Sequence, residues 1–146
     1  YGTFTVAAAA RTTGTVHALD IDPAMVAATR ARAADHANVR VAERDFVATG
    51  TGLADATMDA ALLFNILHAA DPVALLGEAL RVLKPGGHVH VIHWTHDRPT
   101  PRGPALAIRP RPGQCRAWLA EAGFVTPSPD IDLPPWHYGI SAVRAD

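Results

Sequence analysis

Asp20 is the residue of this chain whose type and position best indicate ligand binding. It ends the apolar segment at residues 15–20, and Asp22 and Pro23 follow with the pattern of a helix start. In a doubly wound α/β domain, a carboxylate at the end of the second strand accepts hydrogen bonds from ribose hydroxyls. Asp20 therefore indicates a nucleoside-containing ligand, and capping of a turn is the alternative role.

Two histidines are candidates for acid–base chemistry. His93 lies at the carboxyl end of a predicted strand, where α/β active sites collect, and His68 follows Asn65 by three residues at the end of another strand. A histidine has the unperturbed pKa that a general base needs near neutral pH. A solvent-facing or structural histidine is the alternative for both positions.

The other histidines do not predict a metal centre. Strand alternation places His88 and His90 on one face and His93 on the other, so these side chains cannot converge on one ion. Two imidazoles without a third ligand make a poor zinc site, and we expect no metal. Five arginines between residues 98 and 116 are expected in a solvated loop, with binding of an anionic substrate as the alternative.

The elements that must position these residues alternate between strand and helix, as in a parallel α/β sheet. Strands are predicted at 15–20, 39–42, 58–65 and 88–94. Helices are predicted from Gly2 to Arg11, after Asp22, from residue 71 to a Lys-Pro-Gly-Gly turn at 84–87, and at 114–122. Two extended segments, near 124–132 and 138–144, complete the pattern.

Composition narrows the function classes. The 146 residues are 49% hydrophobic and fit one domain, 1–146, with a usable core. A net charge of −1 gives no electrostatic support for nucleic acid or a membrane surface, and no apolar run is long enough to span a bilayer. The single cysteine, Cys115, excludes an intramolecular disulfide framework and favours the cytoplasm.

Five segments, in this order and spacing, resemble the class I S-adenosylmethionine-dependent methyltransferases, particularly the small-molecule branch with the generic methyltransferase domain. They read YGTFTVA, ALDIDPAMV, ERDF, MDAALLFNILH and LRVLKPGGHVHVIHW, and they cover nearly the whole chain. The resemblance implies a Rossmann-like α/β fold with a mostly parallel sheet. Its strand order would be 3-2-1-4-5-7-6 with the last strand antiparallel.

The resemblance also implies a cofactor, S-adenosylmethionine, and a set of binding residues. Gly2 would lie close to the methionine part, Asp20 would accept from the ribose hydroxyls, and Ile21 would pack on adenine. Asp45 would accept from the adenine amino group with Phe46 beside it, and Asn65 would lie near the methionine moiety. These roles agree with the chemistry of the side chains. Carboxylates accept hydrogen bonds from hydroxyl and amino groups, and apolar side chains pack on a flat base.

One departure from the family is expected to affect the sheet. The central first strand and the first glycines of the loop precede the family's equivalent of Tyr1, so the domain is expected to be incomplete at its N-terminal end. Orphaned backbone groups cost roughly 1 to 3 kcal/mol each. Upstream residues, strand exchange with another chain in a homo-oligomer, or direct pairing of the second and fourth strands would satisfy them.

The predicted activity is methyl transfer to a small-molecule acceptor, with His68 or His93 assisting deprotonation. Residues 65–68 lack the Asn/Asp-Pro-Pro-aromatic motif of enzymes that methylate amino groups of nucleic acids and proteins. The alternative function is a non-catalytic methyltransferase-like remnant that binds the cofactor weakly or not at all and serves as an oligomeric or interaction module.

Overall fold

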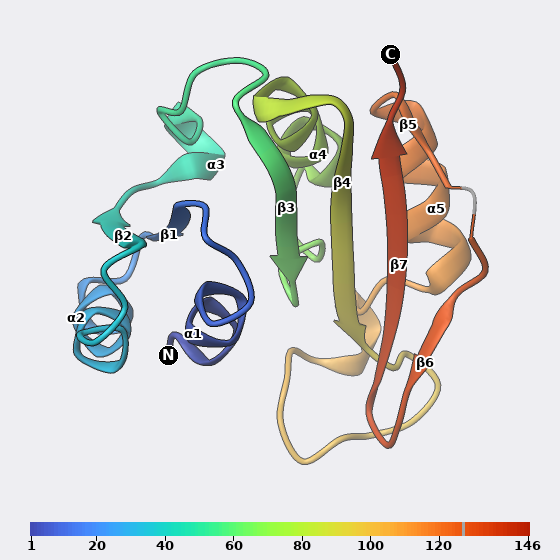
Figure 1. Cartoon of the computed structure of the whole chain (residues 1–146). Helices are drawn as coiled ribbons and strands as arrows, with labels where there is room; N and C mark the ends of the chain where they lie inside the picture. The colour runs from blue at the N-terminus through green and yellow to red at the C-terminus, as the bar shows by residue number, and fades with distance from the viewer. Residues whose placement is uncertain (127) are drawn as a thin grey trace. The chain divides into compact units, whose positions relative to one another are not determined.

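The computed structural model describes residues 1–126 and 128–146. Residue 127, in the extended segment predicted at 124–132, lies outside the described residues. The chain divides into two compact units, Tyr1–Gly52 and Leu53–Asp146, which we describe separately. Figure 1 labels the helices and strands of both.

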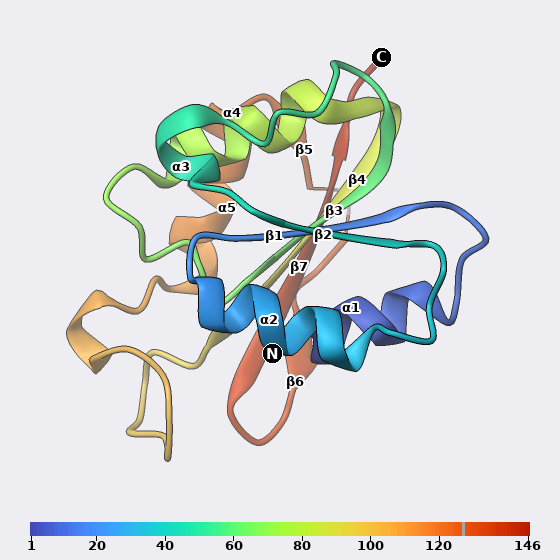
Figure 2. The same ribbon diagram turned by 90° about the vertical axis from the view of Figure 1, so that its left-hand side faces the viewer.

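The first unit is a parallel two-stranded sheet with three helices. Strand β1 pairs with β2 in a register that joins Val16 to Val39 and Asp20 to Glu43, and α1 and α2 pack against this pair (Figures 1 and 2). The bounds are α1 Thr3–Ala9, β1 Val16–Asp20, α2 Pro23–Arg32, β2 Val39–Glu43 and α3 Phe46–Thr49.

The start of α2 confirms the helix signal in the sequence. The Asp22 carboxylate accepts from the Ala24 backbone N–H at 2.8 Å, and Pro23 occupies the first helical position, where no donor is needed. Only two residues therefore separate the end of β1 at Asp20 from the start of α2 at Pro23. Asp20 is therefore held at the carboxyl end of its strand, directly before a helix N-terminus.

The second unit is a five-stranded sheet with α4 and α5 on one face (Figures 1 and 2). Strands β3 and β4 are parallel, whereas β7 runs antiparallel to β4, β5 and β6. The bounds are β3 Met58–Phe64, α4 Pro72–Val82, β4 Leu83–Trp94, a short 3-10 helix Leu106–Ile108, α5 Pro112–Glu121, β5 Phe124–Val125, β6 Ile131–Leu133 and β7 His137–Arg144.

The strand orders confirm the predicted fold class. The second unit has the order β3-β4-β7-β5, which is the 4-5-7-6 part of the expected sheet with an antiparallel last strand. The β1–β2 pair of the first unit corresponds to strands 2 and 3. Among the described residues, β1 pairs with β2 alone and β3 pairs with β4 alone.

The Lys-Pro-Gly-Gly segment at 84–87 was predicted as a turn between a helix and a strand. In the structure it lies inside strand β4. Strand β4 already begins at Leu83, which pairs with Met58, and the next pair joins His88 to Ala60. Between these two pairs, four residues of β4 oppose the single residue Asp59 of β3, so residues 84–87 form an excursion inside the strand. Gly86 has a φ of 73°, and a Cβ on Gly87 would lie 2.8 Å from the Lys84 carbonyl oxygen.

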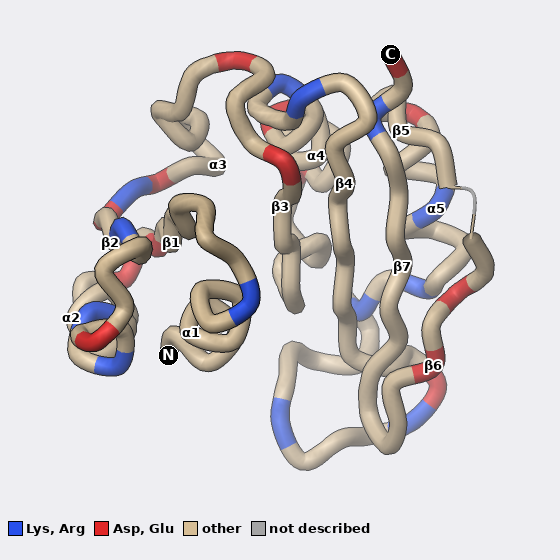
Figure 3. Tube along the Cα trace, in the orientation of Figure 1, with Lys and Arg blue, Asp and Glu red and all other residues tan. Residues whose placement is uncertain are grey.

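The core of the second unit lies between the sheet and its two helices. Alternate residues of β4 are buried from Gly87 to His93, and β4 packs against α4, while α5 packs against β5 and β7. The largest fully buried aliphatic side chains are Leu67, Leu76, Leu83, Val89, Val91, Leu119 and Ile140. Figure 3 shows that charged residues lie mainly in loops and at the ends of elements, away from the middle of β3, β4 and β7. No helix in the described ranges is long and apolar enough to cross a membrane.

Arg144 closes the end of α4, and its replacement by leucine should lower the free energy of unfolding by about 1 to 3 kcal/mol. Its guanidinium donates to the carbonyl oxygens of Leu80 and Leu83 at 3.0 and 2.5 Å, near the helix end where carbonyls lack helical partners. Urea denaturation measures the change. Arg11→Leu is the matched control because Arg11 is exposed and bonds one carbonyl, that of Ala7. Equal stability of Arg144→Leu and wild type would contradict this role.

Candidate functional site

The first unit brings Asp20 and Asp45 to the same edge of its sheet. Asp20 ends β1, Asp45 follows β2 by two residues, and the Arg44 backbone N–H donates to the Asp20 carbonyl at 2.8 Å. The carboxyl ends of parallel strands are where α/β domains bind ligands. Each carboxylate also has a local role, since Oδ1 of Asp20 accepts from the Asp22 N–H and Oδ1 of Asp45 accepts from the Ala48 N–H.

The other predicted cofactor residues of this unit adjoin those acids or begin a helix. Ile21 is 60% exposed directly after Asp20, and Phe46 is half-buried directly after Asp45. Gly2 is the N-cap of α1 with a φ of 74°, and a Cβ there would lie 3.1 Å from the Thr29 Cα. A close approach of α1 to α2 therefore requires glycine at this position. The binding roles of these residues stay predictions.

The second unit brings together Asn65, His68 and His93. Strands β3 and β4 end side by side, with Phe64 opposite Ile92, and the Asn65 backbone N–H donates to the Ile92 carbonyl at 2.7 Å. Asn65 adopts a φ of 58°, a left-handed conformation that turns the chain sharply after the strand. Its side-chain Oδ1 is buried and has no hydrogen-bond partner among the described residues.

The two candidate bases contact each other but differ in exposure. His68 Nδ1 lies 3.4 Å from His93 Nε2, with the rings nearly perpendicular at 83°. His68 is exposed, whereas His93 has no exposed surface. Burial lowers the pKa of His93 to about 4, so this imidazole is neutral at physiological pH. Only His68 is placed to meet a molecule from solvent.

The surroundings of His93 come from three distant segments. The Tyr138 ring of β7 stacks at 6.3 Å, and its hydroxyl donates to the Pro110 carbonyl at 2.8 Å and lies 3.3 Å from Cys115 Sγ. Burial raises the pKa of Tyr138 well above its usual range. Arg109 is a further nearby charge that disfavours protonation of His93.

Arg109 contradicts the expectation of a solvated arginine loop. It is only 8% exposed, and its guanidinium donates to the carbonyl oxygens of Pro104 and Thr95 at 2.9 and 3.0 Å. The loop between β4 and α5 folds back around this side chain and satisfies it with backbone acceptors. Nothing in the sequence distinguished Arg109 from its neighbours, because the acceptors come from the fold of the loop itself.

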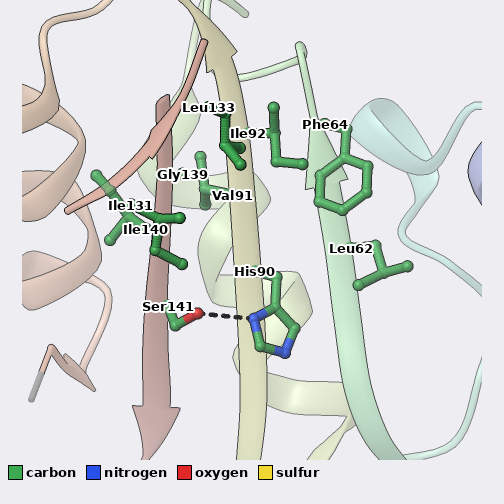
Figure 4. A pocket seen from close by; sticks show the side chains of 10 residues that line it. All are labelled: Leu62, Phe64, His90, Val91, Ile92, Ile131, Leu133, Gly139, Ile140 and Ser141. Atoms are coloured by element: carbon green, nitrogen blue, oxygen red, sulfur yellow. Dashed lines mark hydrogen bonds between the residues drawn. The ribbon is translucent and has the colours of Figure 1, made fainter. Parts of the chain in front are cut away.

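A hollow of about 250 Å³ lies on the opposite face of the second sheet. Apolar side chains of β3, β4, β6 and β7 line it, and His90 Nδ1 meets Ser141 Oγ at 2.9 Å within it (Figure 4). His88 and His90 stack on this same face at 5.9 Å, as strand alternation predicts. Across the described ranges, no group of three or more His, Cys, Asp or Glu residues could hold a metal ion.

The profile of a methyltransferase domain family matches residues 1–87. The chain belongs to this methyltransferase domain family. The match contains all of the predicted site residues except His93, and S-adenosylmethionine is the cofactor expected for the family. Our prediction of the family is thereby confirmed, and the cofactor that we predicted is the one expected for this family.

Similar proteins extend the comparison. A ribosomal protein L11 methyltransferase from Methylococcus capsulatus is 44% identical over 89 residues, which are 60% of this chain and 28% of that protein. The chain thus spans less than a third of the curated relative. A crystal structure of an S-adenosylmethionine-dependent methyltransferase from Aquifex aeolicus matches with a TM-score of 0.87 and 21% identity, over 99% of this chain and 77% of the other. The cyclase SpnF matches with a TM-score of 0.83 and 17% identity, over 99% and 71%.

The curated relative contradicts our prediction of a small-molecule partner. Its name gives a ribosomal protein as the substrate, whereas we inferred a small acceptor from the missing Pro-Pro-aromatic motif and the neutral charge. A short motif after one strand reports on the geometry around the reacting group. It does not report on the size of the molecule that carries this group.

Proposed function

We propose that this chain contributes the cofactor-binding and proton-accepting residues of a methyltransferase that acts on a protein. The exposed His68, held at the end of β3 by contact with the buried His93, is the observation that carries the chemical part. The curated relative supports the protein acceptor. A cytoplasmic location is part of this proposal and rests on the single unpaired Cys115.

Cofactor binding is assigned to the acids and their neighbours. Asp20 accepts from the ribose hydroxyls through the carboxylate oxygen that the Asp22 N–H leaves free, while the exposed Ile21 packs on adenine. Asp45 has one oxygen engaged by the Ala48 N–H and offers the other to the adenine amino group, with Phe46 beside it. Gly2, at the start of α1 in the same unit, is assigned to the methionine part.

Methyl transfer needs an acceptor that is held in line and, if protic, deprotonated. The cofactor supplies an activated methyl group on a sulfonium. His68 Nε2 would accept the proton that leaves the acceptor, and a bound cofactor would supply the methyl group. The exposed position of His68 lets its imidazole meet an acceptor that comes from solvent.

Replacing Asp20 by alanine should weaken binding of S-adenosylhomocysteine about 10- to 100-fold, because a charged acceptor of hydroxyl hydrogen bonds contributes roughly 1.5 to 3 kcal/mol. Titration calorimetry on the full-length protein measures the change. Glu43→Ala is the matched control, since Glu43 is exposed and pairs in register with Asp20 on the neighbouring strand. Unchanged affinity of the Asp20→Ala variant would show that this carboxylate only orders the turn.

The protein acceptor is tested with labelled S-adenosylmethionine and purified ribosomal protein L11. We expect label in the protein and none in serum albumin. Cofactor binding without methylation of any protein would favour the second candidate, a non-catalytic or differently acting domain. The likeness to a cyclase of the same fold is the observation behind that candidate, because one fold supports several activities.

A further inference from the structure

The contact between His68 and His93 joins one exposed and one buried imidazole. The two nitrogens, His68 Nδ1 and His93 Nε2, are 3.4 Å apart, so one of them donates a hydrogen bond and the other accepts. A neutral imidazole carries one N–H, and its other nitrogen has a lone pair. The direction of this bond therefore decides which nitrogen of His68 keeps its lone pair for an external proton.

The surroundings of His93 keep its ring neutral. Burial is the main cause and outweighs the Trp94 backbone, which favours a proton on His93. The nearby charges of His68, Arg109 and His137 disfavour that proton. The Tyr138 ring stacks against it and supplies no acceptor, because the Tyr138 hydroxyl is engaged by Pro110 and Cys115. When His68 is protonated, both of its nitrogens are donors, so His93 Nε2 must then be the acceptor.

The same direction holds when His68 is neutral. Suppose that His93 Nε2 carried the proton and donated it to a neutral His68. Each time His68 gained a proton, the proton of His93 would have to move from Nε2 to Nδ1. A ring with no exposed surface has no contact with water to exchange that proton. A fixed proton on His93 Nδ1 and a fixed lone pair on Nε2 avoid this exchange and serve both states of His68, although Nδ1 is buried without a hydrogen-bond partner among the described residues.

We propose that His93 is a positioning residue that accepts a hydrogen bond from His68 Nδ1–H and so keeps the lone pair of His68 on Nε2. This inference rests on the proposed function for the use that is made of that lone pair. His93 then acts through His68 and does not touch the acceptor. The bond gains strength when His68 takes up a proton, since its donor becomes charged.

The position of the proton on His68 can be measured without any methyl acceptor. Nitrogen-15 NMR of the labelled full-length protein at pH 8 should find the proton on Nδ1 in the wild type. In His93→Leu we expect the Nδ1–H to Nε2–H ratio to fall by about fivefold or more, the equivalent of one neutral hydrogen bond of about 1 kcal/mol. A wild-type His68 with its proton on Nε2 would overturn the proposal, even if His93→Leu did not fold.

Two further variants separate positioning from structural support. His93→Gln places an amide oxygen where Nε2 was, so it should restore much of the Nδ1–H population. His90→Leu changes a half-buried histidine of the same strand on the opposite face, where it contacts Ser141, and should leave the tautomer of His68 unchanged. A ratio that shifts equally in His90→Leu and His93→Leu would contradict the inference.

Activity provides an independent second readout. His93→Leu should lower kcat for methylation of ribosomal protein L11 about tenfold and leave KM nearly unchanged, with recovery in His93→Gln. If the wild type shows the Nδ1–H tautomer but methylates nothing, the proposed function fails and the positioning of His68 stands. If methylation proceeds while His68 carries its proton on Nε2, the positioning fails and the function stands.

Discussion

Methyl transfer is expected to fall about 100- to 10,000-fold when His68 is replaced by alanine, because a positioned general base contributes a factor of this order. The side chain lies exposed after β3, so its removal leaves no cavity in the core. The affinity for S-adenosylhomocysteine should therefore change by less than about twofold, which is the pattern of a lost transition-state interaction. Initial rates with labelled cofactor, beside calorimetry on the same variant, measure both quantities.

His88→Ala is the matched control for this loss of rate. His88 is an exposed histidine of the same unit, but it stacks on His90 on the face of β4 away from His93. We expect its methyl transfer to equal that of the wild type. Full activity of His68→Ala would remove His68 from the chemistry, whereas loss of cofactor binding in this variant would point to a structural role.

Local chemistry explains which elements the sequence predicted correctly. Asp22 and Asp71 each precede a proline and cap a helix, because a short acidic side chain can bond free backbone N–H groups while proline needs no donor. The apolar run at 58–65 forms β3 over Met58–Phe64. Such signals are complete within a few residues, and the resemblance to a family then supplied the strand order.

The features that the sequence did not predict depend on contacts between distant segments. His93 was predicted at the end of a strand, but its burial requires Tyr138 from β7 and the loop that holds Arg109. The excursion at 84–87 depends on the register of β4 against β3. A single sequence gives the types of these residues without their partners, so it left His68 and His93 as equal candidates.

Acid should destabilise this protein through His93. Because the folded-state pKa is about 4 and the unfolded value is about 6.5, the unfolded chain binds a proton in this range that the folded chain does not. The contribution of His93 to stability is complete above about pH 6.5 and is lost as the pH falls toward 4. The loss amounts to about 3 kcal/mol at pH 4, and urea denaturation at pH 7, 6, 5 and 4 measures it.

The variant His93→Gln isolates this effect, because glutamine does not titrate. The stability of this variant at one pH can differ from that of the wild type. The slope of its free energy of unfolding against pH should be smaller by the contribution of one bound proton. His90→Gln is the control, since burial lowers the pKa of His90 in the same direction but this side chain is only partly buried, which predicts a smaller change. The same pH dependence in His93→Gln and wild type would mean that His93 takes up its proton in the folded state. A charged His93 could not accept from His68 Nδ1–H, so this measurement also tests the basis of the histidine pair.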